Sequence, residues 1–191
     1  MAEYAYKMFN KDLTCTKGRG KYQYCEGVWI EEKEANCVRN GFHAAKNPLD
    51  CLNYYRWDDS VCYVVEIDGD IDEDSTDSKV ACTRIRLDRK LNLSQFVAHA
   101  CWYIMQHAQL EDHRLVQHEV GDLDRAANDQ SKFVIVRGKD PKARGLIGDV
   151  IGLVQEEEDS KEIRAAGAFM IDGKKYRPGI WYNAWGEKVD A

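Results

Sequence analysis

The stretch VCYVVEIDGDIDEDSTDSKVACTRIRL, residues 61–87, places two apolar runs on either side of an acidic segment. Residues 61–67 are apolar on both faces of an extended chain, as expected of a strand inside a sheet. Residues 80–87 predict a second strand, with the acidic residues as a solvated loop between the two. A calcium-binding EF-hand loop starting at Asp68 would need glycine sixth and glutamate twelfth, where this chain has Glu73 and Lys79. The stretch therefore predicts two strands and a loop, without an EF-hand.

The segments before this stretch also favour extended structure. Residues 4–9 are rich in aromatic side chains and predict an opening strand, and residues 22–30 predict another strand, broken at Gly27. Asn40-Gly41 is a strong turn signal. A short helix is expected to begin with Pro48 at its first position.

After the stretch comes the clearest helical pattern of the chain. Residues 94–107 predict a helix, with Ser94 as its cap and Val97, Cys101, Ile104 and Met105 as its apolar stripe. The polar residues 108–132 predict a partly helical connector.

Apolar segments in the last third of the sequence predict a β-rich unit. They lie at residues 133–136, 145–154 and 165–171, and residues 174–182 predict a turn into a last strand. The expected organisation is an α+β domain at residues 1–107, the connector, and the β-rich C-terminal unit at 133–191. The fold class is α+β, a mixed or antiparallel sheet with a few short helices.

Composition narrows the classes of function. The 27 basic and 33 acidic residues give a net charge of −6, which argues against a general DNA or RNA binder because such proteins need a basic face. The seven cysteines contain no closely spaced pair, which argues for buried thiols in a reducing compartment and against a zinc module. The N-terminal residues lack a secretory signal, and no apolar run is long enough to span a membrane. We expect a cytoplasmic protein, in the host cytosol, with no membrane partner.

Catalytic and metal signatures are missing from the sequence. Neither a phosphate-binding P-loop, a Rossmann glycine motif nor a nucleophile elbow occurs. His118-Glu119 begins a zinc-protease motif, but Asp122 stands where its second histidine belongs. No metal site is predicted.

Two segments resemble an uncharacterised domain family common in phages and prophages. They are NGFHAAKNPLDCLNYY at 40–55 and DSTDSKVACTRI at 74–85, preceded by FNKDLTC and YQYCEG, and the C-terminal DGKKYRPGIWYNAWGEKVDA is similar to that family's ending. The resemblance covers residues 3–105 and 165–191. It implies a phage-encoded accessory protein.

The segment from Gly41 is also similar, more distantly, to the ADP-ribosyltransferase fold. The poly(ADP-ribose) polymerase group has a Gly-aromatic stretch, a short helix ending Ala-Asn-Tyr, and then a strand, and Gly41-Phe42, Asn53-Tyr54 and residues 63–67 follow that order. This resemblance implies that NAD or another nucleotide is the ligand. Its expected ligand-binding residues are Tyr6, Lys7, Gly41, Phe42, His43, Asn53, Tyr54 and Tyr55.

In this resemblance His43 takes the place of the ring that stacks on nicotinamide, and Tyr6 or Lys7 that of the residue that holds the ribose. The catalytic glutamate of that fold has no counterpart near Val80, where Asp77 is the candidate acid. An alternative explanation is purely structural: Gly41 supplies a turn, Phe42 a core ring, and His43 a satisfied hydrogen bond.

Three functions remain open at this point. The first is a non-catalytic accessory protein that binds a host protein or a nucleotide and interferes with host defence. The second is an NAD-using enzyme of the ADP-ribosyltransferase type. The third is a structural module associated with the virion. The sequence says nothing about the oligomeric state.

Overall fold

A computed structural model describes residues 2–16, 20–37, 39–74, 77–110, 113–123, 132–158 and 160–190. The chain divides into two compact units, Met1–Asn92 and Leu93–Ala191. Each unit has a hydrophobic core made from its own residues. The organisation expected from composition instead assigned the helix at 94–107 to the first part.

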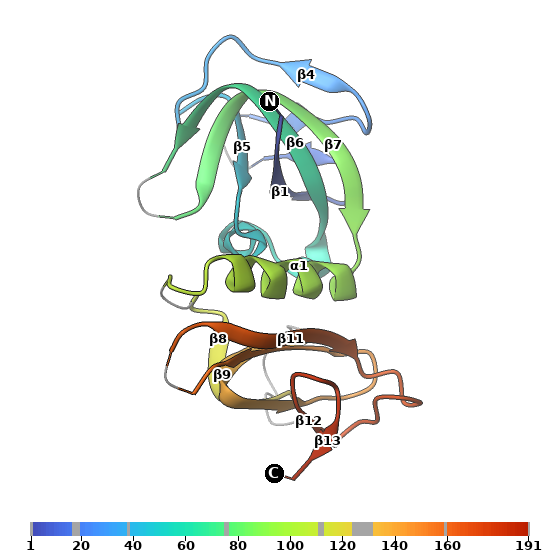
Figure 1. Ribbon diagram of the computed structural model, residues 1–191. Coiled ribbons are helices and arrows are strands. Elements are labelled where there is room, and N and C mark those ends of the chain that lie inside the picture. Colours follow the sequence, from blue (N-terminus) through green and yellow to red (C-terminus); the bar gives the residue numbers. More distant parts are fainter. Residues whose placement is uncertain are drawn as a thin grey trace. The chain divides into compact units, whose positions relative to one another are not determined.

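The first unit is built mainly from strands (Figure 1). Its elements are β1 (Glu3–Asn10), β2 (Thr14–Cys15), β3 (Tyr22–Gln23), β4 (Trp29–Glu31), β5 (Phe42–Ala45), the 3₁₀ helices η1 (Pro48–Asn53) and η2 (Trp57–Asp59), β6 (Ser60–Glu73) and β7 (Lys79–Leu91).

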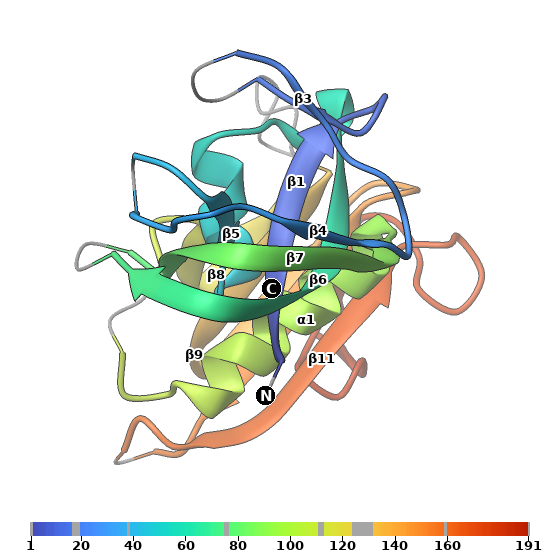
Figure 2. The same cartoon turned by 90° about the horizontal axis from the view of Figure 1, so that it is seen from above.

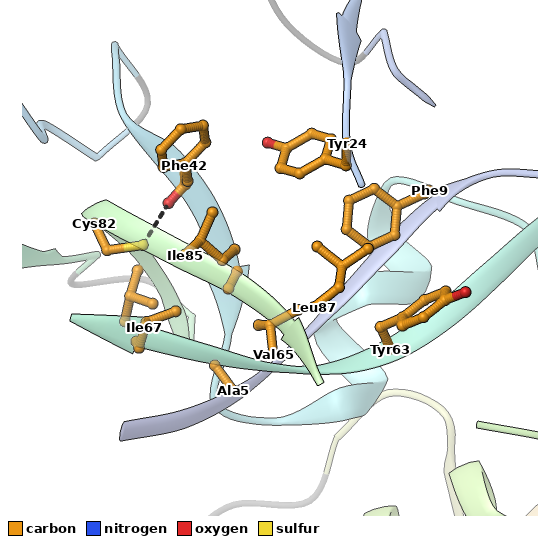
Figure 3. Close-up of a cluster of buried hydrophobic side chains, with 12 residues drawn as sticks. Ala5, Phe9, Tyr24, Phe42, Tyr63, Val65, Ile67, Cys82, Ile85 and Leu87 are labelled. Atoms are coloured by element: carbon orange, nitrogen blue, oxygen red, sulfur yellow. Dashed lines mark hydrogen bonds between the residues drawn. The ribbon is translucent and has the colours of Figure 1, made fainter. Parts of the chain in front are cut away.

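The larger sheet of this unit closes on itself. Its strand order is β4-β7-β5-β1-β6, and β6 also pairs with β7, so β7, β5, β1 and β6 form a closed ring to which β4 adds at β7 (Figures 1 and 2). Register shifts at Val64/Val65 and Asp68/Ile71 interrupt the β6–β7 ladder, as β-bulges do where a strand bends. The core side chains of β1, β5, β6 and β7 point into the closed sheet, Phe9 and Leu87 among them (Figure 3).

The acidic segment is a strand where the sequence predicted a loop. β6 runs on to Glu73, and its carboxylates face arginines of β7: Asp68 lies 2.9 Å from Arg84, and Glu66 lies 2.7 Å from Arg86. These cross-strand pairs offset the like charges along β6, which would otherwise repel one another.

The short helix after Asn47 forms with the predicted start. The Asn47 side chain accepts a hydrogen bond of 3.0 Å from the backbone N–H of Leu49, and Pro48 occupies the first turn. Leu49 and Cys51 are buried, and Cys51 Sγ lies 3.4 Å from the carbonyl oxygen of Tyr6. This contact holds η1 against β1.

The second unit combines one long helix with a second sheet. Its elements are α1 (Leu93–Gln106), β8 (Val116–Asp122), β9 (Phe133–Arg144), β10 (Val150–Glu156), β11 (Ile163–Met170), β12 (Trp181–Tyr182) and β13 (Lys188–Val189). The sheet has the order β11-β10-β9-β12-β13, with β8 paired to β9.

Helix α1 packs on β10 and β11 (Figure 2). A Cβ at Gly152 of β10 would lie 2.8 Å from both Val97 and Cys101, so glycine there permits the close approach of the helix. The helix begins at Leu93, one residue before the predicted cap. Ser94 is instead in the first turn, and its hydroxyl has no hydrogen-bond partner among the described residues.

The predicted α+β class is wrong. The fold is mostly β, with 51% of the described residues in strands or β-bridges and 13% in helices. The expected partly helical connector contributes the strand β8, and η1 and η2 are single short 3₁₀ segments. The β-rich character of residues 133–191 agrees with the prediction. In the described part of the chain, none of the helices is both long and apolar enough to cross a membrane.

Candidate ligand-binding site

The seam between β1 and β5 is the weakest join in the closed sheet. The two strands share a single residue pair, Tyr6 opposite Ala45, whereas β1 pairs with β6 along its whole length. Beyond this pair the strands diverge towards Phe9 and Phe42, and the ring of Tyr24 lies between those two side chains (Figure 3). A short opening in the sheet results.

A cavity of about 980 Å³ lies at this opening. Its walls come from β1, β5, η1, the segment 15–24 and the turn before Gly41. The lining residues are Tyr6, Lys7, Met8, Cys15, Gly20, Lys21, Tyr22, Tyr24, Glu32, Arg39, Asn40, Gly41, Phe42, His43, Ala44, Ala45, Asp50, Cys51, Tyr54, Tyr55 and Lys79.

The cavity takes residues from both faces of the sheet. Because side chains alternate along a strand, Lys7 and Phe42 share the inner face with the core, whereas Tyr6 and His43 lie on the outer face. The cavity therefore reaches through the seam and does not rest on one side of it.

Lys7 is the buried cation of the site. Only 7% of the residue is exposed, and its ammonium donates a hydrogen bond to the carbonyl oxygen of His43 across the seam. Its nitrogen lies 5.5 Å from the ring centre of Phe9 and 5.4 Å from that of Tyr24. Burial lowers the pKa of Lys7, and the neighbouring thiols of Cys15, Cys51 and Cys82 act in the opposite direction.

His43 is half-buried on the outer face of β5. Burial lowers the pKa of its imidazole, and the charges of Lys7 and Lys79 lower it further. The ring is therefore neutral at physiological pH, and a neutral imidazole offers a planar apolar face together with one donor and one acceptor.

Seven of the nine residues predicted for the site line the cavity, and two do not. Tyr6, Gly41, Phe42, Tyr54 and Tyr55 join Lys7 and His43 there. Asn53 is exposed at the end of η1, away from the lining. The candidate acid Asp77 also lies outside it, where its carboxylate accepts a hydrogen bond of 2.9 Å from the backbone N–H of Lys79.

The purely structural explanation accounts for part of this segment as well. Gly41 has a φ of +86°, as the predicted turn requires, and Phe42 is buried in the core at 2% exposure. Both residues also line the cavity. The two roles coexist.

Tyr54 and Lys79 form the wall next to η1. The Lys79 ammonium donates to the Tyr54 hydroxyl at 3.1 Å and pairs with Asp74 at 2.8 Å. The hydrogen bond to Asp74 is the main cause of the raised pKa of Lys79. Because Tyr54 is 41% exposed, its ring is accessible to a ligand.

The buried thiols of Cys51, which lines the cavity, and of Cys82, opposite Phe42, are not activated nucleophiles. Burial raises the pKa of Cys51 to about 12 and that of Cys82 to about 12. Cys15 is half-buried and accepts a hydrogen bond from the Tyr55 hydroxyl at 3.2 Å. Cysteine-based catalysis, which needs a thiolate near neutral pH, gains no support from Cys51 or Cys82.

The site has an aromatic wall that the sequence analysis did not identify. Tyr22, Tyr24 and Phe42 stand edge to face, with ring centres 4.9 to 5.9 Å apart. Tyr22 and Tyr24 come from the segment after β2, which folds back so that the Tyr24 N–H donates to the Leu13 carbonyl oxygen. The two tyrosines are spaced by two residues, which puts both rings on one side of an extended chain, and this spacing was the available signal.

Cations outnumber carboxylates among the lining residues. Lys7, Lys21, Arg39 and Lys79 contribute positive charge, and Glu32 and Asp50 contribute negative charge. The Asp50 carboxylate is already held by Ser78, whose backbone N–H and hydroxyl donate to it at 3.1 and 2.5 Å. Within the described ranges, no cluster of three acidic, histidine or cysteine side chains is suited to hold a metal ion.

Residues 4–99 match a family described as a domain of unknown function, DUF7666, so the chain belongs to that family. No curated protein and no solved structure matches the chain. The matched region includes all residues that line the cavity.

Proposed function

We propose that the first unit binds a nucleotide in the cavity at the β1–β5 seam, without catalysing a reaction on it. The observation that carries the proposal is the meeting, in one cavity, of the buried Lys7 ammonium, the neutral His43 ring and the exposed Tyr54 ring. A nucleotide presents the complementary groups, an anion and a planar base.

The size and the lining of the cavity support this class of ligand. A volume of about 980 Å³ is at the upper end of the range typical of small-molecule sites. Aromatic side chains stack on nucleobases, and lysine and arginine in the lining favour phosphate. The negative net charge of the whole chain does not oppose this, because Lys7 and Arg39 line the cavity without an ion-pair partner among the described residues, whereas Lys21 and Lys79 are paired with Asp12 and Asp74.

The proposal leaves catalysis out because the acid that the resemblance offered does not line the cavity, and the two described carboxylates that do, Glu32 and Asp50, are respectively exposed and held by Ser78. Cleavage of NAD needs an acid beside the reacting sugar carbon, where positive charge develops. Asp77 lies outside the cavity lining, and Asp50 is held by Ser78. Release of nicotinamide from NAD by the purified protein would contradict this part of the proposal and favour the enzyme instead.

The resemblance of residues 3–105 to phage domains supports a biological setting for the proposal. Binding of a host nucleotide is one way for a phage-encoded accessory protein to interfere with host defence without an enzymatic step. A host protein recovered in stoichiometric amounts from lysate would favour a protein partner over the nucleotide.

The direct test is calorimetric titration of the full chain with AMP, GMP, CMP, UMP and NAD. We expect micromolar binding of at least one of them, and a tenfold or greater loss of affinity in His43→Ala, since base–aromatic stacking contributes about 1–3 kcal/mol. His118→Ala, in the exposed part of β8, is the matched control and should bind as the wild type does. Failure of all five ligands to bind would refute the proposal.

A further inference from the structure

Lys7 differs from the other cations of the cavity because it is buried and has no acidic partner in the part of the chain that the structure describes. Lys21 pairs with Asp12 at 3.4 Å and Lys79 pairs with Asp74 at 2.8 Å. Arg39 has no ion-pair partner within the described residues, but it is exposed and water solvates it. Among the described residues, the Lys7 charge has the His43 carbonyl oxygen, two aromatic rings and the thiols of Cys15, Cys51 and Cys82 as neighbours, and no carboxylate pairs with it.

A buried ammonium in such surroundings lacks a counter-ion. Taking a charge out of water is costly unless an opposite charge or several hydrogen bonds replace the lost hydration. An ammonium has three N–H donors, and the one hydrogen bond to His43 uses one of them. The cavity borders this ammonium, so an anion that enters it can supply the missing charge and accept further hydrogen bonds.

The two ends of the cavity differ in exposure. Lys7, Tyr24 and Phe42 are each less than 8% exposed, whereas Tyr22 is 39% and Tyr54 is 41% exposed. Tyr22, Tyr54 and the half-buried His43 therefore have exposed ring area for stacking. The buried Tyr24 and Phe42 rings already contact each other and Tyr22.

We propose that Lys7 is the receptor for the phosphate of a mononucleotide, which binds with its phosphate in the seam and its base towards Tyr22 and Tyr54. This inference rests on the proposed nucleotide binding and adds the orientation and the class of ligand. It assigns recognition of the anion to Lys7 and not to the exposed cations Lys21 and Arg39.

The test compares each mononucleotide that binds with its own nucleoside. For wild-type protein we expect the nucleotide to bind more tightly, and the ratio of the two dissociation constants measures what the phosphate contributes. In Lys7→Met this ratio should fall roughly ten- to a hundred-fold, because that is about the factor by which one hydrogen bond between charged groups increases an affinity. Lys7→Arg keeps the charge and should retain most of the ratio.

Lys90→Met is the matched control, because it removes an exposed cation of the first unit that does not line the cavity. Its ratio should stay within about threefold of the wild-type value, as is usual for exposed charges. A ratio that survives in Lys7→Met, or that falls as far in Arg39→Met as in Lys7→Met, would overturn the orientation while leaving nucleotide binding intact. If no mononucleotide binds to the wild type, the proposed function and this inference both fail.

Competition with inorganic phosphate provides a second measurement that needs no variant. Free phosphate should occupy the Lys7 site and weaken the binding of the mononucleotide, while the nucleoside, which lacks that group, should bind with unchanged affinity. If inorganic phosphate weakened the binding of the nucleoside as much as that of the mononucleotide, phosphate would occupy the end of the cavity assigned to the base. That result would overturn the inference, even if Lys7→Met does not fold.

Discussion

Lys7 illustrates how a single residue can favour ligand binding at the expense of stability. Its ammonium is buried without an acidic partner, so the ligand-free protein bears a desolvation cost that a methionine would not have. We predict that Lys7→Met raises the free energy of unfolding by about 1–2 kcal/mol, with a melting temperature higher by about 2–6 °C. Thermal unfolding followed by circular dichroism would measure this.

The stabilisation should depend on pH in a definite direction. The pKa of Lys7 is lower in the folded protein than its ordinary value of 10.5. Below the folded pKa both states hold the proton and the full cost is present, and the cost disappears as the pH rises from the folded pKa to 10.5. The advantage of Lys7→Met is therefore greatest below the folded pKa and shrinks as the pH rises towards 10.5. An advantage that grows with pH would show that burial is not the cause.

Some residues of the site could be predicted from the sequence and others could not, and the difference has a physical reason. Gly41, His43 and Tyr54 belong to one continuous segment whose order of residue types could be compared with a known pattern. Tyr22 and Lys79 reach the same cavity from other segments, and only the three-dimensional path of the chain brings them there. The unpaired state of Lys7 is likewise a property of its surroundings, which the sequence does not display.

Among the elements, the turn into β5 depends on Gly41. This residue has a φ of +86°, and a Cβ on it would lie 3.0 Å from the Cα of Ala35 and 3.1 Å from the carbonyl oxygen of Cys82. Both are backbone atoms that cannot rotate away. We predict that Gly41→Ala lowers the free energy of unfolding by about 2–4 kcal/mol and weakens nucleotide binding, because β5 forms one side of the seam.

Gly27→Ala is the control for this prediction. Gly27 also has a positive φ, +72°, but no atom lies within 4 Å of a Cβ placed there. Its substitution should cost about 1–2 kcal/mol from the backbone conformation alone. Chemical denaturation of both variants separates the two contributions, and equal losses would mean that the contacts with Ala35 and Cys82 do not matter.

The strand β6 shows why an acidic segment can be misjudged. The residues after Ile67 alternate between acidic and other side chains, Asp68-Gly69-Asp70-Ile71-Asp72, which is the two-residue period of a strand. The density of negative charge suggested a loop, but Asp68 pairs with Arg84 of β7, sixteen residues further on, and Glu73 pairs with Lys46, twenty-seven residues earlier. Local composition cannot reveal such a match.

For the molecule as a whole, the predicted fold class was wrong because short helical signals were taken as evidence for a helical layer beside the sheet. The helix at 94–107 is real, but the other helical segments are short 3₁₀ turns that connect strands. The positions of the long strands were predictable from apolar runs. The closure of the first sheet was not, because it depends on pairing between β1 and β5, which are more than thirty residues apart.

The separation of the cores leads to a prediction about the isolated first unit. All residues lining the cavity lie between Tyr6 and Lys79, and the core cluster around Phe9 and Leu87 is contained in Met1–Asn92. A domain of about ninety residues with its own core can fold alone. We predict that a chain ending at Asn92 folds and binds the same mononucleotide with a dissociation constant within about threefold of the full-length value. Calorimetry on both chains measures this. A folded fragment that has lost binding would show that the second unit contributes to the site, since the cavity residues themselves are all retained.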